Sequence, residues 1–234
     1  MIQPPAWLGQ RPLAKRPDGF GVIKPTPPIL RDRRFATVDL LPPPGDDRFH
    51  SSVQTAPADV LRRSTWKAAC PVASADLSYL TVTFWGFDDM PHTGELLVNS
   101  SVATDVIQVF RKLYQTRFPI EQMRVTTNRD LHAPPTGDGN NTTSFECRPV
   151  TGSTSWSQHA YGLAIDVDPF QNPYARDDIV VPERASAYTD RAWRRPGMIY
   201  PGDVVTDSFA AIGWGWGGNW HSLKDWMHFS QNGR

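Results

Sequence analysis

The alternation of apolar and polar residues predicts where regular structure begins. Residues 80–85 read Leu-Thr-Val-Thr-Phe-Trp and alternate with a period of two, which is typical of a β-strand. Apolar residues recur at helical spacing through residues 102–113. We expect a helix there, with Ser100 or Ser101 as its N-cap and Pro119 closing the segment.

Further elements follow along the chain. Residues 120–125 resemble a second strand, and residues 132–145 are rich in Pro, Gly, Asn and Thr, which predicts a loop. Asp203 is placed to cap a helix that Gly213 ends. This order of helices and strands predicts an α+β fold, with a small central antiparallel sheet and flanking helices, rather than a parallel α/β sheet.

Two short alternating segments carry candidate chemistry. In residues 163–167 the apolar residues face one side and Asp166 the other, so Asp166 projects from a strand. Gly162 permits a sharp bend before this strand, which brings His159 back beside Asp166. Residues 226–230 alternate in the same way and place His228 on the face opposite Met227.

If the two strands pair, three donor side chains converge on one point. Two imidazoles and one carboxylate are a suitable set for a catalytic zinc ion that keeps an open fourth position. We therefore predict one Zn²⁺ held by His159, Asp166 and His228. Asp225 lies three residues before His228 and is placed to act as a general base rather than as a ligand.

These residues carry a resemblance to a known family. The patterns S-x-H-x-x-G-x-A-x-D, over Ser157–Asp166, and D-x-x-H, over Asp225–His228, resemble those of the zinc D-alanyl-D-alanine peptidases. The resemblance covers roughly residues 80–234. It implies the same three metal ligands, Asp225 as general base and Arg148 as the substrate-binding arginine. It also implies a fold like that of the hedgehog signalling domain and of these peptidases.

The resemblance implies an activity on peptidoglycan stem peptides. Asp225 stands where the dipeptidase branch usually has Glu, and the aspartate form resembles the L-alanyl-D-glutamate endopeptidases. The first alternative is a D-alanyl-D-alanine carboxypeptidase, which shares the metal chemistry. The second is a zinc-containing module that binds cell wall or signals without catalysis, because the hedgehog domain keeps a zinc site.

Composition narrows the class of protein. The chain has 24 basic and 24 acidic residues, so it lacks the basic excess that nucleic-acid binding normally needs. No apolar run is long enough to span a bilayer, and the N-terminus lacks the pattern of a secretory signal. Because the substrate of the family lies outside the cytoplasm, the resemblance favours an extracytoplasmic protein, with any signal or anchor upstream of this chain. We expect a monomer.

The N-terminal part differs in composition from the rest. Ten of the 22 prolines lie in the first 45 residues, which opposes regular structure there. We expect a Pro-rich arm or linker over residues 1–70 and the catalytic domain over residues 71–234. The arm is either a spacer from an anchor or a segment that wraps the domain. Given the extracytoplasmic setting, we expect Cys70 and Cys147 to form a disulfide rather than remain two buried thiols.

Overall fold

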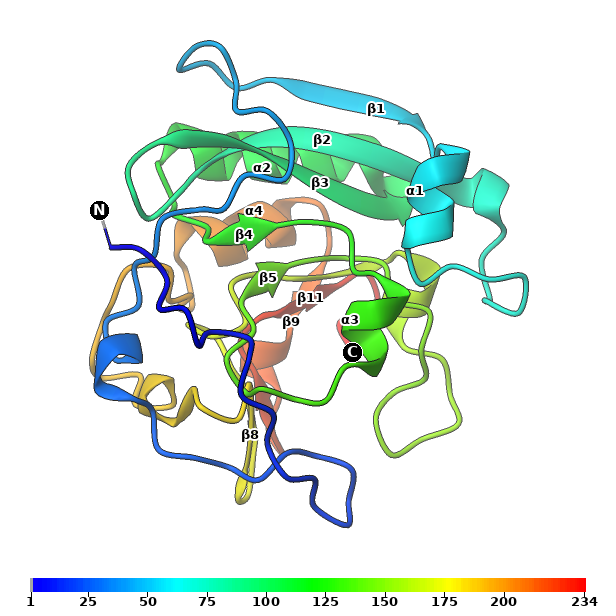
Figure 1. Cartoon of the computed structure of the whole chain (residues 1–234). Helices are drawn as coiled ribbons and strands as arrows, with labels where there is room; N and C mark the ends of the chain where they lie inside the picture. Colours follow the sequence, from blue (N-terminus) through cyan, green and yellow to red (C-terminus); the bar gives the residue numbers. More distant parts are fainter. Residues whose placement is uncertain (1) are drawn as a thin grey trace.

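The computed structural model describes residues 2–234 of the chain. Its N-terminal half is built on an antiparallel sheet in the order β1-β2-β3 (Figure 1). The strands are β1 (Ser51–Thr55), β2 (Leu77–Trp85) and β3 (Pro91–Asn99). The predicted alternating strand is confirmed as the second half of β2, which is buried over almost its whole length.

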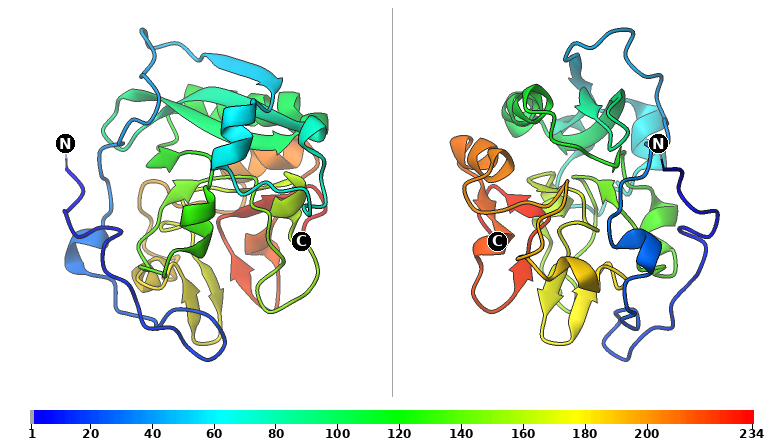
Figure 2. Two further views of the ribbon diagram at one scale, coloured as in Figure 1. Left: turned by 45° about the vertical axis from the view of Figure 1, so that its right-hand side comes forward. Right: turned by 90° about the vertical axis from the view of Figure 1, so that its left-hand side faces the viewer.

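Helix α2 (Ala103–Gln115) covers one face of this sheet and is the predicted amphipathic helix (Figures 1 and 2). The predicted serine cap is wrong. Asn99 ends β3, and its side-chain oxygen accepts from the backbone N–H of Ser101, so both serines lie in a 3₁₀ turn that precedes the helix. The helix ends four residues before Pro119.

The main core forms where α2, the first sheet and the C-terminal strands meet. It includes Val106 and Phe110 of α2, Leu80 of β2, and Ile165 and Phe229 of the C-terminal strands. Helix α4 (Val204–Ala211) lies beside α2 (Figure 2). Its predicted cap is confirmed, because the Asp203 carboxylate accepts from the backbone N–H groups of two residues in the first turn. The strands that carry Asp166 and His228 are thus anchored by a continuous apolar core.

The remaining strands are short and form three further small assemblies among the described residues. Two are antiparallel sheets, in the orders β6-β11-β9 and β10-β7-β8, and one is a parallel pair, β4-β5. Their bounds are β4 Gln122–Met123, β5 Asn141–Thr142, β6 Ala164–Asp166, β7 Tyr174–Arg176, β8 Ile179–Val181, β9 Gly215–Trp216, β10 Lys224–Asp225 and β11 His228–Ser230. The two remaining α-helices are α1 (Ala58–Arg63) and α3 (Asn128–His132).

The α+β class is confirmed, but the described strands do not form one central sheet. Instead the strands divide into small antiparallel sheets, because strands of two or three residues are separated by turns rich in Gly and Pro. The predicted strand over 120–125 shrinks to β4. The predicted loop over 132–145 begins at the last residue of α3 and contains β5.

The proline-rich N-terminal segment packs along the molecule on the side away from α4 (Figure 2). Its Leu30 and Phe35 are fully buried against Phe170 and Tyr188. Arg33 is buried as well, and its guanidinium makes a two-point ion pair with Glu121. The domain boundary at residue 70 stays a prediction.

The predicted disulfide between Cys70 and Cys147 is present and joins segments 77 residues apart in the chain. Among the described residues, no helix is long and apolar enough to cross a bilayer.

Candidate metal centre

The pairing of β6 with β11 places two of the predicted ligands opposite each other. The two strands are antiparallel, and His228 is the register partner of Asp166. The intervening pair, Ile165 and Phe229, is fully buried in the main core. Because side chains of a strand alternate between faces, this packing fixes His228 and Asp166 on the same opposite face. The predicted convergence of the two strands is confirmed.

His159 reaches the same point from a 3₁₀ turn, Gln158–Tyr161. The Ser157 hydroxyl accepts from the His159 backbone N–H at 3.3 Å, and Gly162 ends the turn with φ +68°. A Cβ at position 162 would lie 2.5 Å from the backbone nitrogen of Asn99, so only glycine fits this turn. The predicted bend at Gly162 is confirmed, and His159 is 2% exposed.

The orientation of the His159 ring follows from one hydrogen bond. Its Nδ1 lies 2.6 Å from the carbonyl oxygen of Ser144, which can only accept. Nδ1 therefore carries the proton, and in the neutral ring Nε2 presents a lone pair. This Nε2 lies 3.2 Å from His228 Nδ1 and 3.3 Å from an Asp166 carboxylate oxygen.

The three donor atoms form a nearly equilateral triangle. The third side, from His228 Nδ1 to the same Asp166 oxygen, is 3.1 Å. A tetrahedral zinc ion with bonds of about 2.0–2.1 Å separates its ligand atoms by about 3.3–3.4 Å. Lone pairs held so close together repel unless a proton or a cation lies between them. The donor set therefore fits one zinc ion.

Charges around the triangle are strongly coupled. Burial acts to raise the pKa of Asp166, but the His159 and His228 imidazoles outweigh it and hold that pKa below its ordinary value. Burial likewise acts to lower the pKa of His159, and the Asp166 carboxylate raises it above the ordinary value. Asp166 therefore stays ionised and favours a positive charge, a proton or a metal cation, between the three donor atoms.

Asp225 lies next to His159, Asp166 and His228, the triad whose donor atoms form the triangle, but it is not part of it. It belongs to β10, where it is the register partner of Tyr174 of β7, and not to β11, which carries His228. Its Oδ1 atom is buried and has no hydrogen-bond partner among the described residues. Burial and, to a smaller degree, Asp166 raise the pKa of Asp225 to about 7, against the opposing effects of His228 and Arg148.

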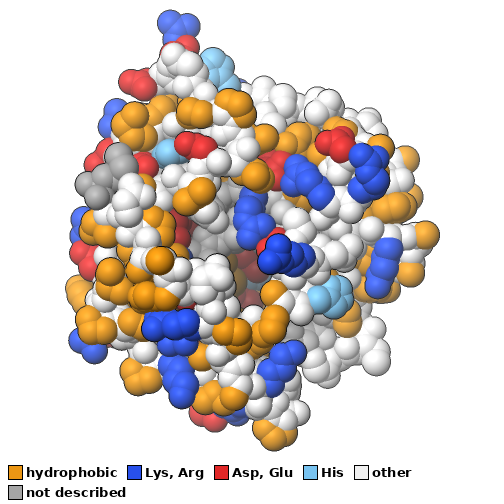
Figure 3. All heavy atoms as spheres, in the orientation of Figure 1, with side chains coloured by type: hydrophobic (Ala, Val, Ile, Leu, Met, Phe, Trp, Pro, Cys, Tyr) orange, Lys and Arg blue, Asp and Glu red, His pale blue; other side chains and the backbone are white. Residues whose placement is uncertain are grey.

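Arg148 lies at the edge of the same site. Its Nε donates to Glu146 at 2.7 Å, and its side chain is 31% exposed. Burial acts to lower the pKa of Arg148, but Glu146 first, and then Asp166 and Asp225, raise it. The charge of Arg148, the predicted substrate-binding arginine, therefore interacts with the carboxylates of Asp166 and Asp225. The space-filling view shows basic side chains beside a central hollow that contains acidic ones (Figure 3).

Comparison with known proteins agrees with this geometry. Residues 151–231 match the family model described as D-alanyl-D-alanine carboxypeptidase. Over this segment the chain is similar to the D-alanyl-D-alanine carboxypeptidase family. The matched segment contains the triad and Asp225, whereas Arg148 precedes it. No curated protein and no solved structure matches the chain.

Two neighbours of the site were not predicted from the sequence. The Ser144 carbonyl that orients His159 is a backbone group, and nothing in the identity of residue 144 indicates it. Glu146, which holds Arg148, had a detectable signal, because an acid only two residues away in the sequence is a natural partner for Arg148.

Proposed function

We propose that the protein is a zinc-dependent peptidoglycan peptidase that hydrolyses amide bonds of stem peptides. The observation that carries this proposal is the triangle of three lone-pair donors, His159 Nε2, Asp166 Oδ and His228 Nδ1, with Asp225 buried beside it. A purely structural zinc site needs four ligands and no base. Three ligands with an adjacent unpaired carboxylate support a catalytic site instead.

We assign the zinc ion to His159, Asp166 and His228. When bound, the ion supplies a Lewis acid that lowers the pKa of a water to about 7 and polarises the scissile carbonyl. Ser144 holds His159 in the tautomer that leaves Nε2 free to bind.

Asp225 is the general base in this proposal. Its unpartnered Oδ1 takes a proton from the attacking water and returns it to the leaving amine. Arg148 orients the peptide through its two terminal NH₂ groups, since among residues 2–234 only its Nε has a partner, Glu146. The positive charge of Arg148 also stabilises the negative charge that develops on the carbonyl oxygen.

We propose cleavage of the L-alanyl-D-glutamate bond. Asp225 supports this branch, because its members resemble the chain in having aspartate at this position. Removal of a terminal D-alanine is the second candidate, and the matched family, described as D-alanyl-D-alanine carboxypeptidase, favours it. The disulfide supports an extracytoplasmic location. We further propose that the protein acts as a monomer.

Mass analysis of purified muropeptides tests this function. Incubation with the zinc-loaded protein should release the peptide cut between L-Ala and D-Glu. Loss of one alanine from the pentapeptide end would assign the carboxypeptidase activity instead. Binding to insoluble wall with no released peptide would leave the non-catalytic binding module, with the zinc ion in a structural role.

A further inference from the structure

A cavity of about 900 Å³ lies beside the metal centre, within the range of small-molecule sites. Three segments line it: the loop after α1, with Thr65 and Lys67; helix α3, with His132; and the loop from Cys147 to Thr154. None of the triad residues lines the cavity. Arg148 does line it, and the charge of Arg148 also interacts with Asp166 and Asp225. The cavity therefore extends the site away from the metal centre on the side of Arg148.

The lining of this cavity is basic. Lys67, Arg148 and His132 contribute to it, and no Asp or Glu does. His132 is oriented by its own helix, because its Nδ1 lies 2.7 Å from the Asn128 carbonyl oxygen, which leaves Nε2 free. A cavity with this lining attracts anions.

Two of the three basic side chains have free donors. Arg148 uses Nε for Glu146, and among the described residues neither of its terminal nitrogens has a partner. Those two nitrogens are the groups that bind a carboxylate in a two-point arrangement. Lys67 is exposed, and within residues 2–234 its ammonium group forms no ion pair. The cavity thus offers two separate cationic groups.

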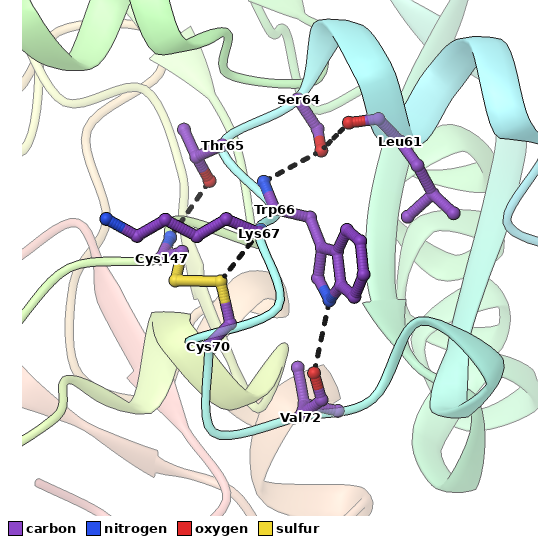
Figure 4. Close-up of a disulfide and its surroundings, with 8 residues drawn as sticks. All are labelled: Leu61, Ser64, Thr65, Trp66, Lys67, Cys70, Val72 and Cys147. Carbon is purple, nitrogen blue, oxygen red and sulfur yellow. Dashed lines mark hydrogen bonds between the residues drawn. A yellow bond between two sulfur atoms is a disulfide. The ribbon is translucent and has the colours of Figure 1, made fainter.

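The backbone segments that carry Lys67 and Arg148 are held together. The disulfide joins Cys70 to Cys147, and the backbone N–H of Cys147 donates to the Thr65 hydroxyl at 2.9 Å. The backbone N–H of Lys67 donates to Cys70 Sγ at 3.1 Å. Figure 4 shows the Lys67 side chain extending past Cys147, with no hydrogen bond from its amine to the other residues drawn. Two cations held on one cross-linked frame are preorganised for a ligand with two negative groups.

We propose that this cavity is an anion-binding subsite of the active site. In it, Lys67 binds one carboxylate of the stem peptide and Arg148 binds another. The inference rests on the proposed function for the identity of the peptide. The subsite gives the protein a preference for stem peptides with free carboxylates over stem peptides whose carboxylates are amidated. Lys67 lies outside the segment that matches the family, so this specificity belongs to the N-terminal part of the chain.

Calorimetric titration tests the subsite without turnover. The parent protein, Lys67→Gln and Arg129→Gln are titrated, in excess chelator, with a stem peptide that has free carboxylates and with its fully amidated analogue. Arg129 is the matched control, because it is exposed on α3 and does not line the cavity. We expect Lys67→Gln to weaken binding of the acidic peptide about 5- to 10-fold and binding of the amidated peptide less than about 2-fold. Arg129→Gln should change both by less than about 2-fold.

Three results would overturn the subsite. They are equal binding of the two peptides by the parent, no effect of Lys67→Gln, and equal weakening by Lys67→Gln and Arg129→Gln. Unchanged thermal unfolding of the Lys67 variant shows that it is folded. Muropeptide cleavage by the zinc-loaded parent is measured separately. Selective binding without cleavage removes the hydrolase assignment alone, and cleavage without Lys67 dependence removes the subsite alone.

Discussion

The two parts of this chain contribute different things to one site. The segment 151–231 matches a known family and supplies the triad and Asp225. The part before it lies outside that match, yet it supplies Arg148, the cavity wall with Lys67, and the Ser144 carbonyl that orients His159. Metal chemistry depends on a few residues at fixed spacing, which a motif captures. The surroundings of the substrate depend on contacts between segments distant in the chain.

The comparison also shows that the matched segment is not independent. The residue pair Thr143 and Asp166 forms an antiparallel bridge with backbone hydrogen bonds in both directions. The main core joins Ile165 and Phe229 to residues of β2 and α2. Strand β6, which carries Asp166, is therefore held in place by residues that lie outside the matched segment.

The largest expected effect lies within the matched segment. Asp225→Ala should lower kcat about 100-fold or more while zinc remains bound, because our proposal makes Asp225 a general base and not a ligand, and a general base typically contributes about 10²- to 10⁴-fold. Steady-state hydrolysis of a stem peptide measures it, with Asp207→Ala, at an exposed position of α4, as the matched control. Turnover at the parent rate in the Asp225 variant would remove its role.

The next effect tests whether the N-terminal segment is part of the fold. Arg33 is buried, pairs with Glu121 through two contacts of 2.7 and 2.6 Å, and donates to the Asp138 carbonyl. Arg33→Ala leaves a buried carboxylate unpaired, so we expect the free energy of unfolding to fall by about 3–5 kcal/mol. Its neighbour Arg34 pairs with Asp32 in an exposed position, and Arg34→Ala should cost about 0.5 kcal/mol.

Denaturant unfolding of the two arginine variants gives the comparison directly. Equal, small losses for both would show that the N-terminal segment is a loosely attached linker. A large loss for Arg33→Ala alone would show that it is built into the catalytic unit.

Removing the disulfide should have a smaller effect on stability. It closes a loop with a sequence separation of 77, and such cross-links typically contribute about 2–4 kcal/mol. The double variant Cys70→Ala, Cys147→Ala should lose that amount in a denaturant titration. It should also bind the acidic peptide more weakly, because the Lys67 loop is no longer held beside Arg148. Unchanged peptide affinity would show that the disulfide does not organise the cavity.

The smallest effect concerns helix α3, which forms one wall of the cavity. Burial acts to raise the pKa of Asp130, but its bonds to Arg124 and Thr127 outweigh it and lower the pKa to about 2. A lowered folded-state pKa gives a stability contribution that is present above the unfolded value of 3.8 and is lost as the pH falls toward 2. Because the side chain is 34% exposed, solvent screens these pairs, and we expect about 1 kcal/mol.

Urea unfolding of Asp130→Asn between pH 6 and pH 2.5 tests this contribution. The difference from the parent should be largest at pH 6 and should shrink below about pH 4. Asp105→Asn, at the exposed first turn of α2, is the control. A difference that stays constant with pH would show that the pairing at Asp130 contributes no charge-dependent stability.

Local patterns in the sequence predicted much of this structure, and long-range contacts account for what they missed. The strand at 80–85, the helices α2 and α4, the Asp203 cap and the convergence of the triad follow from spacing within a few residues or from one strand pairing. The burial of Arg33 could not be predicted, because its partner Glu121 lies 88 residues away. The division into small sheets depends on where each strand ends, and the strand propensities of the residues do not define those ends.

Zinc analysis of purified variants tests the central claim most directly. The parent protein and Asp225→Ala should each bind one zinc ion, and His159→Ala should bind none under the same conditions, with the loss of activity in His159→Ala following the loss of metal. Full zinc occupancy in His159→Ala, or loss of zinc from Asp225→Ala, would contradict a site in which His159, Asp166 and His228 hold the ion and Asp225 stands beside it.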